Sequence, residues 1–223
     1  MLNLEAQTEA LQIVAVAAKK HGLVVAPVGS IFFLFTEGRH LATKDVDVVV
    51  HVDVDTIAPL ELLEKMGREL GVAVSSGDKA TVTVTVESKY GPMKIDLIRG
   101  KDGARRSFLP RELLRAAARH GRRDGSILWY PTEFVILFKA DAAVDRARRA
   151  RSGGPKAAEN LRRAEVFRQD VFAHVQSSLE GDGLNEKYLI EGLSHLKQAR
   201  RKEVAALLEA ASGGRLTLSV GTD

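Results

Sequence analysis

The valine-rich run at residues 45–52 is the sequence feature that most constrains the fold. It reads DVDVVVHV, with valine at five of its eight positions. β-Branched side chains favour extended backbone, and a near-continuous apolar run is typical of a strand that is buried on both faces. The run therefore predicts a central strand, in a sheet that other elements cover.

The rest of the chain mixes helices and strands up to about residue 100 and is mostly helical after it. Periodicity predicts helices over 4–20 and 58–70, and strands over 23–28, 72–75, 81–87 and 93–98. Further helices are predicted over 110–120, 131–149, 156–179 and 184–211, with a short strand at 127–130 and a loop at 151–155. This order predicts an α+β fold with a first domain over 1–105, a mostly helical region over 106–211 and a tail over 212–223.

Composition excludes several classes of site. Cysteine is absent, which rules out disulfides, thiolate metal sites and cysteine nucleophiles. The longest apolar stretches fall far short of the roughly 20 residues that a membrane span needs. The N-terminal segment carries Glu5 and Glu9 and no basic stretch, unlike a signal peptide. We therefore expect a cytoplasmic protein with no membrane partner.

Charge is distributed unevenly. Residues 1–100 carry a net charge of −3 (10 Lys/Arg, 13 Asp/Glu), and residues 101–223 carry +7 (23 Lys/Arg, 16 Asp/Glu). A basic second half suits an enzyme that acts on a polyanion, but arginine-rich helices can also be simply solvated. The cluster Arg146, Arg148, Arg149 and Arg151 leaves the same two interpretations open, a solvated face or a patch for an RNA acceptor.

Three aspartates carry the chemistry that the sequence suggests. Asp45 and Asp47 are two apart in a predicted strand, so both side chains point to one face, roughly 6–7 Å apart. Such a pair repels unless a cation lies between its members, and hard carboxylate oxygens suit Mg²⁺ (or Mn²⁺). Asp96 lies in another apolar strand and joins the pair if the two strands are neighbours. The alternatives are a turn-proximal acidic pair and, for Asp96, an exposed strand residue.

A glycine-serine pair supplies the other half of the predicted site. Gly29-Ser30 follows the strand at 23–28 and precedes a bulky apolar segment that we interpret as a short helix. Glycine allows close backbone approach, and a serine at a helix start offers its hydroxyl and backbone N–H groups to phosphate. The simpler interpretation is that Ser30 only caps the helix.

Together these residues resemble the polymerase-beta-like nucleotidyltransferase superfamily, whose motif is Gly-Ser, then Asp-x-Asp, then a distal Asp. The resemblance covers residues 20–100 well. The segment Arg39–Asp47 (RHLATKDVD), with Thr43 and Lys44, is similar to that of the AbiE-effector, toxin-type branch. Phe138-Lys139-Ala140 with Arg146 resembles a later helix of that branch, and Phe167–Phe172 resembles one that brings a supporting Asp, here Asp170.

The resemblance implies a mixed, mostly antiparallel sheet and a Mg²⁺-dependent transfer of a nucleoside monophosphate from an NTP to a hydroxyl. It implies that Asp45, Asp47 and Asp96 bind metal and act in catalysis, and that Gly29, Ser30, Thr43, Lys44 and Lys139 bind the nucleotide, with Arg39, Arg146 and Asp170 in support. The acceptor would be RNA, a protein or a small molecule, and a toxin-type member would have an antitoxin partner.

Other functions stay open at this point. A catalytically inactive relative would bind nucleotide or a protein partner with the same fold, but all three acidic positions are filled here. A purely nucleic-acid-binding helical protein would account for the basic second half and would leave the aspartates unexplained. Lys139 also has a simple interpretation, as a helix lysine whose stem covers apolar surface.

Overall fold

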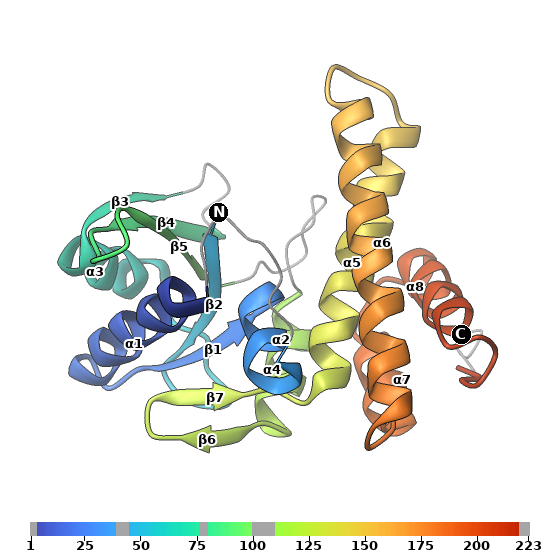
Figure 1. Cartoon of the computed structure of the whole chain (residues 1–223), viewed down its shortest axis with the longest axis horizontal. Coiled ribbons are helices and arrows are strands. Elements are labelled where there is room, and N and C mark those ends of the chain that lie inside the picture. The colour runs from blue at the N-terminus through green and yellow to red at the C-terminus, as the bar shows by residue number, and fades with distance from the viewer. Residues whose placement is uncertain (1–3, 39–44, 76–79, 100–109, 219–223) are drawn as a thin grey trace. The chain divides into compact units, whose positions relative to one another are not determined.

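The computed structural model describes residues 4–38, 45–75, 80–99 and 110–218 (Figure 1). The chain divides into two compact units, residues 1–103 with 117–130, and residues 104–116 with 131–223. The strands are β1 (Val24–Val28), β2 (Asp45–His51), β3 (Val72–Ser75), β4 (Thr81–Val86), β5 (Met93–Ile98), β6 (Arg122–Asp124) and β7 (Ile127–Trp129). The helices are α1 (Leu4–Lys20), α2 (Gly29–Glu37), α3 (Leu60–Leu70), α4 (Arg111–Arg119), α5 (Thr132–Arg151), α6 (Ala157–Glu180), α7 (Glu186–Ser194) and α8 (Gln198–Ala211).

The first unit is built on one seven-stranded sheet of order β3-β4-β5-β2-β1-β7-β6. The pairs β1–β7 and β2–β5 are parallel and the other four are antiparallel. The predicted α+β class with a mixed, mostly antiparallel sheet is therefore confirmed, and the valine-rich run is its central strand β2. After α4, the hairpin β6–β7 returns to this sheet. The sequence had instead predicted that the first domain ends at residue 105.

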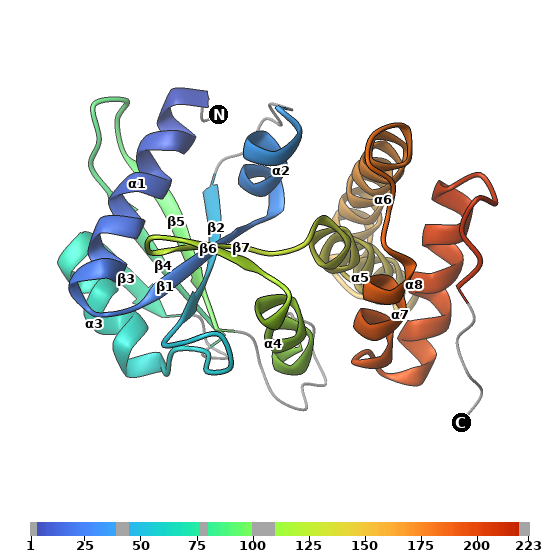
Figure 2. The same ribbon diagram turned by 90° about the horizontal axis from the view of Figure 1, so that it is seen from below.

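The two faces of the sheet differ in what covers them. Val46, Val48 and Val50 of β2 point to one face, where they join a buried core with α1 and α3. Figure 2 shows these two helices on one side of the strands and α2 on the other. Because side chains alternate along a strand, Asp45, Asp47 and His51 point to the face opposite that core. The alternation thus keeps the carboxylates out of the main apolar core.

His51, at the far end of β2, is completely buried. Its Nε2 is 2.5 Å from the hydroxyl of Tyr130, 79 residues further along the chain. Burial lowers the pKa of His51 from 6.5 to about 4, against a smaller opposing effect of Asp53. The imidazole is therefore neutral near pH 7 and links the central strand to the segment that follows β7.

Acid is expected to weaken the first unit through His51. Its folded pKa lies below its unfolded pKa, so the unfolded chain binds more protons between pH 6.5 and about 4. The free energy of unfolding should be highest above pH 6.5 and fall by about 3 kcal/mol on acidification to pH 4. Hydrogen exchange of β1 and β2 at a series of pH values measures this, with His51→Gln as the non-titrating variant. An equal acid loss in wild type and His51→Gln would contradict the assignment.

The second unit is helical, with α5 packed against α6, α7 and α8. Its core is formed by buried side chains of all four helices, including Ile136, Val171, Leu189 and Leu208. A Cβ on Gly192 of α7 would lie 2.3 Å from Leu137 Cδ1, so α7 packs closely on α5 at this glycine. The Glu133 carboxylate accepts a hydrogen bond from the backbone N–H of Asn185 at 2.7 Å, which holds the start of α7.

The helix predicted over 184–211 is wrong in one respect, because it is two helices, α7 and α8. No glycine or proline marks the break at residues 195–197. Arg201 of α8 donates hydrogen bonds to the carbonyl oxygens of Ser194, at 2.9 Å, and Leu196, at 3.3 Å. A side chain of the second helix thus satisfies carbonyl groups that the end of the first leaves without helical partners. In the described part of the chain, no helix has the length and apolar character needed to cross a bilayer.

Candidate active site

Sheet register brings the two acidic segments side by side. β2 and β5 are parallel neighbours, and Asp47 lies directly opposite Asp96. Asp45 lies opposite Lys94. This pair is two residues along the strands from Asp47 and Asp96, and it lies on the same face of the sheet. Asp96 could join the aspartate pair only if its strand lay next to β2, and this condition is met. The three carboxylates lie on one face of two adjacent strands, all partly exposed.

Gly29 forms the corner between β1 and α2, next to Asp47. Val28, the last residue of β1, pairs with Asp47 across the sheet. Gly29 has φ +65°, in the left-handed region that favours glycine, and a Cβ at this position would lie 2.9 Å from Asp47 Oδ2. The absence of a side chain therefore leaves open the space beside this carboxylate.

Ser30 lies in the first turn of α2 and is not its capping residue. The N-cap position is Val28, whose side chain makes no capping hydrogen bond. The interpretation of Ser30 as a mere N-cap is therefore wrong. The start of α2 directs backbone N–H groups and the positive end of the helix dipole away from the helix, beside Asp47. This corner has the chemistry of a phosphate-binding helix start.

Asp96 lies in an unusual electrostatic environment. Its Oδ1 accepts a hydrogen bond of 2.6 Å from the hydroxyl of Thr83, its cross-strand neighbour on β4. Burial is the largest influence on this carboxyl and raises its pKa, and the charge of Asp45 raises it further. Thr83 and Lys94 act in the opposite direction. Removing a negative charge or adding a cation here would relieve the repulsion between Asp45 and Asp96.

Thr83 and Lys94 were not among the site residues predicted from sequence. The signal for both was present, because Lys94 is two residues before Asp96 and 81–86 alternates threonine with valine. Alternation places Lys94 on the face of Asp96, and the hairpin register then aligns Thr83 with Asp96. The register between β4 and β5 could not be read from the sequence alone.

The residues at this face fit a magnesium ion. Asp45 and Asp47 offer hard oxygen ligands, and the missing side chain of Gly29 leaves room beside Asp47. Among the described residues, no three His, Cys, Asp or Glu side chains are arranged to hold a metal by themselves. Mg²⁺ is commonly bound by one or two carboxylates together with water and substrate phosphates, so a complete protein cage is not required.

The other predicted residues lie in the second unit or outside the described residues. Lys139 is buried in the second unit, and its Nζ is 2.7 Å from Asp170 Oδ2, so these two predicted residues form an ion pair. Arg146, also in the second unit, donates a hydrogen bond to Asn160. The actions of Lys139, Asp170 and Arg146 on a nucleotide stay predictions. Arg39, Thr43 and Lys44 lie outside the described residues.

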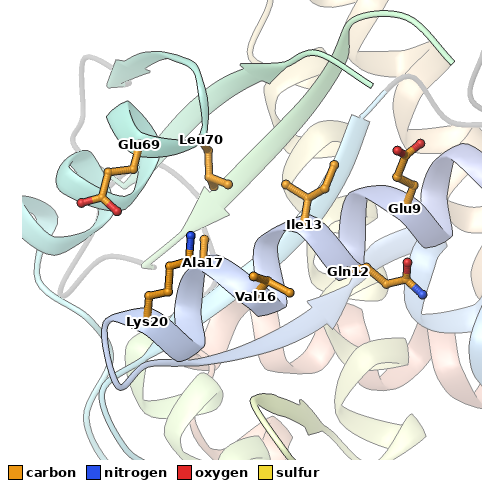
Figure 3. Close-up of a pocket in the computed structure, with 8 residues that line it drawn as sticks. All are labelled: Glu9, Gln12, Ile13, Val16, Ala17, Lys20, Glu69 and Leu70. Carbon is orange, nitrogen blue, oxygen red and sulfur yellow. The ribbon is translucent and has the colours of Figure 1, made fainter. Parts of the chain in front are cut away.

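A surface pocket in the first unit is separate from these carboxylates. It lies on α1 and the end of α3, which cover the opposite face of the sheet (Figure 3). Its lining mixes Ile13, Val16 and Leu70 with Glu9, Lys20 and Glu69. It contains none of the residues on the carboxylate face, so we do not assign it to the same site.

Comparison with known proteins gives a likeness of fold only. No protein-family model matches the chain, and no curated protein matches it. Among solved structures, the chain is similar to an antigenic nucleotidyltransferase-like protein from Paracoccidioides brasiliensis, with TM-score 0.47 and 14% identity over 94% of both chains. It is also similar to JHP933 from Helicobacter pylori, with TM-score 0.39 and 10% identity over 96% of this chain and 94% of that one. A third similar structure is the Thermotoga maritima CCA-adding enzyme complexed with tRNA, with TM-score 0.31 and 14% identity over 90% of this chain and 51% of that one.

Proposed function

We propose that this protein is a Mg²⁺-dependent nucleotidyltransferase that moves a nucleoside monophosphate from an NTP to a hydroxyl group and releases pyrophosphate. The observation that carries the proposal is that Asp47 lies opposite Asp96 on the neighbouring strand and next to Gly29, at the corner where β1 passes into α2. A phosphate-binding corner thereby adjoins a metal-binding carboxylate, which adjoins a carboxylate able to accept a proton. These are the parts that phosphoryl-type transfer requires.

Each residue has a distinct task in this proposal. Asp45 and Asp47 would hold Mg²⁺, which when bound would neutralise triphosphate oxygens and increase the electrophilicity of the α-phosphorus. Ser30 and the N-terminal amides of α2 would bind the β- and γ-phosphates, with the bare backbone of Gly29 allowing their approach. Holding both reactants in line is the main contribution of the protein, since such transfers need little covalent chemistry from it.

Asp96 would take the proton of the attacking hydroxyl. The acceptor oxygen forms a bond to the α-phosphorus, the bond from that phosphorus to the bridging oxygen breaks, and pyrophosphate leaves with the electron pair. Burial and Asp45 raise the pKa of Asp96, which makes its carboxylate a stronger base than an exposed one. The hydrogen bond from Thr83 orients this carboxylate. Asp96 would also contribute to metal binding when a second ion is bound.

A labelling experiment tests the proposal and identifies the acceptor. The protein is incubated with each of the four NTPs carrying a radiolabelled α-phosphate, with Mg²⁺, total RNA and total protein. We expect label in one acceptor fraction, with Mg²⁺ required and with an Asp45→Ala variant inactive. Mn²⁺ should replace Mg²⁺. NTP binding without transfer to any acceptor, including RNA, protein and small-molecule fractions, would instead indicate an inactive nucleotide-binding module. Membership of the toxin-type branch, and an antitoxin partner, stay predictions.

A further inference from the structure

The far end of the α5–α6 hairpin is strongly basic. We define the hairpin tip as residues 145–163, which include the last turns of α5, the connecting loop and the first turns of α6. Figure 1 shows this loop at the end of the hairpin remote from α7. The hairpin tip carries seven basic and two acidic residues. The basic residues are Arg146, Arg148, Arg149, Arg151, Lys156, Arg162 and Arg163.

Three arginines of the two helices are crowded together. Arg146 Nη1 donates to Asn160 Oδ1 at 3.0 Å, which brings its guanidinium against α6. Burial is the largest cause of a lowered pKa at Arg146, and the charges of Arg149 on α5 and Arg163 on α6 lower it further, against smaller opposing effects of Asp145 and Glu159. Like charges so placed repel one another. A bound anion would offset this repulsion.

The neighbouring carboxylates leave some of these cations without an ion-pair partner. Arg149 pairs with Asp145 and Arg163 with Glu159, each at 2.8 Å. Glu203 of α8 accepts from both Arg148, at 2.9 Å, and Arg151, at 3.0 Å. Within the described ranges, no carboxylate forms an ion pair with the remaining three cations, Arg146, Lys156 and Arg162.

A stabilising interaction with a helix dipole accounts for the positions of only some of these basic residues. Basic residues in the last turn of α5 interact favourably with the negative end of its dipole. Those at the start of α6 face the positive end, where acidic residues are the stabilising ones. Lys156, the N-cap residue of α6, makes no side-chain capping hydrogen bond. The start of α6 therefore adds anion-attracting backbone groups to an already basic surface.

We propose that the hairpin tip binds the sugar-phosphate backbone of a nucleic acid. Guanidinium groups bind phosphate oxygens through two parallel hydrogen bonds, and Arg146 and Arg149 follow one helix face at a spacing of roughly 5–6 Å. The loop 152–156 reads SGGPK, without the large apolar side chains that an interfacial membrane segment inserts. That the bound strand also supplies the acceptor hydroxyl rests on the proposed function, whereas binding itself does not.

Binding can be measured without NTP or Mg²⁺. Fluorescence anisotropy of a labelled single-stranded RNA, and of the DNA of the same sequence, is recorded from about 50 to about 200 mM KCl. The test variant is Arg149→Gln/Arg162→Gln/Arg163→Gln. The matched control is Arg68→Gln/Arg122→Gln/Arg123→Gln, which removes the same charge from exposed positions of the first unit. Circular dichroism checks the folding of each, and Arg162→Gln/Arg163→Gln serves if the triple variant does not fold.

We expect the test variant to bind RNA about 10- to 100-fold more weakly, with the slope of log affinity against log salt smaller by about 2. The control should bind as wild type does. Equal weakening in both triple variants, unchanged binding in the test variant, or binding only to vesicles of anionic lipid would overturn the proposal. Binding of DNA with the same dependence on these arginines would also support the proposal, because the proposed contacts are to the sugar-phosphate backbone.

The outcome is separable from the proposed function. An Asp47→Asn variant should bind RNA as wild type does, because Asp47 is not part of the hairpin tip. If no NTP is used but the hairpin tip still binds RNA in a manner that depends on its arginines, the nucleotidyltransferase assignment fails and this inference stands. If transfer occurs but the arginine variants bind RNA normally, this inference fails and the nucleotidyltransferase assignment stands.

Discussion

Replacing Asp47 with Asn is expected to lower Mg²⁺-dependent nucleotidyl transfer by about 10³-fold or more, while the protein stays folded. Asparagine has nearly the same size and lacks the charge that would hold the cation between β2 and the start of α2. Such a loss corresponds to about 4 kcal/mol of transition-state stabilisation. The fold should be unaffected because Asp47 is partly exposed and the change adds no bulk.

Calorimetric titration with an NTP, with and without Mg²⁺, shows whether binding is lost together with transfer. Asp124→Asn is the matched control, because it removes one carboxylate from an exposed position on β6 of the same sheet. It should leave both measurements unchanged. Wild-type affinity for Mg²⁺–NTP in both Asp45→Asn and Asp47→Asn would show that the carboxylates do not form the site.

Gly29→Ala is expected to weaken Mg²⁺–NTP binding by about 10- to 100-fold and to destabilise the first unit by about 1–2 kcal/mol. Two effects combine at this position. A residue with a Cβ is strained at φ +65°, and that Cβ would lie 2.9 Å from Asp47 Oδ2. The carboxylate would have to turn away, which removes it from the orientation that binds the ion.

Gly38→Ala separates the two effects at the other end of the same helix. Gly38 has φ +64°, and a Cβ there would meet no atom of the described residues within 4 Å. Gly38→Ala should therefore lower the free energy of unfolding by about as much as Gly29→Ala does, and leave Mg²⁺–NTP affinity unchanged. Thermal unfolding and calorimetric titration of both variants provide the comparison. If the two lower the affinity equally, the effect arises from strain in α2 and not from contact with Asp47.

Local patterns were sufficient to predict most elements of the first hundred residues. The valine-rich run, the alternation at 81–86 and the Gly29-Ser30 corner correspond to β2, β4 and the start of α2. These features depend on side-chain period and on glycine conformation, both of which act over a few residues. The same reasoning missed β6, a three-residue strand of exposed Arg122, Arg123 and Asp124, because its extended form depends on pairing with β7.

The sequence singled out the three aspartates and the Gly29 corner of the candidate site, and did not specify how they are arranged. Two carboxylates spaced by two in a strand must share a face, so the relation of Asp45 to Asp47 followed directly. Whether Asp96 joined them depended on which strand lies next to β2, and 41 residues (52–92) separate β2 from β5. The hydrogen bond from Thr83 depends on the register of the β4–β5 hairpin. The contact of His51 with Tyr130 depends on the pairing of β7 with β1.

By itself, the sequence determined most of the helices and strands, which face of β2 carries charge, and that one corner needs glycine, since all three depend mainly on neighbours within a few residues. The tertiary structure decided that β5 pairs with β2 in the register that aligns Asp96 with Asp47, and that α7 ends before α8 begins. It also decided that the arginines of α5 and α6 meet at one hairpin tip. The physical reason is that register and packing minimise the free energy of contacts between distant segments, and no local pattern specifies which of those segments will meet.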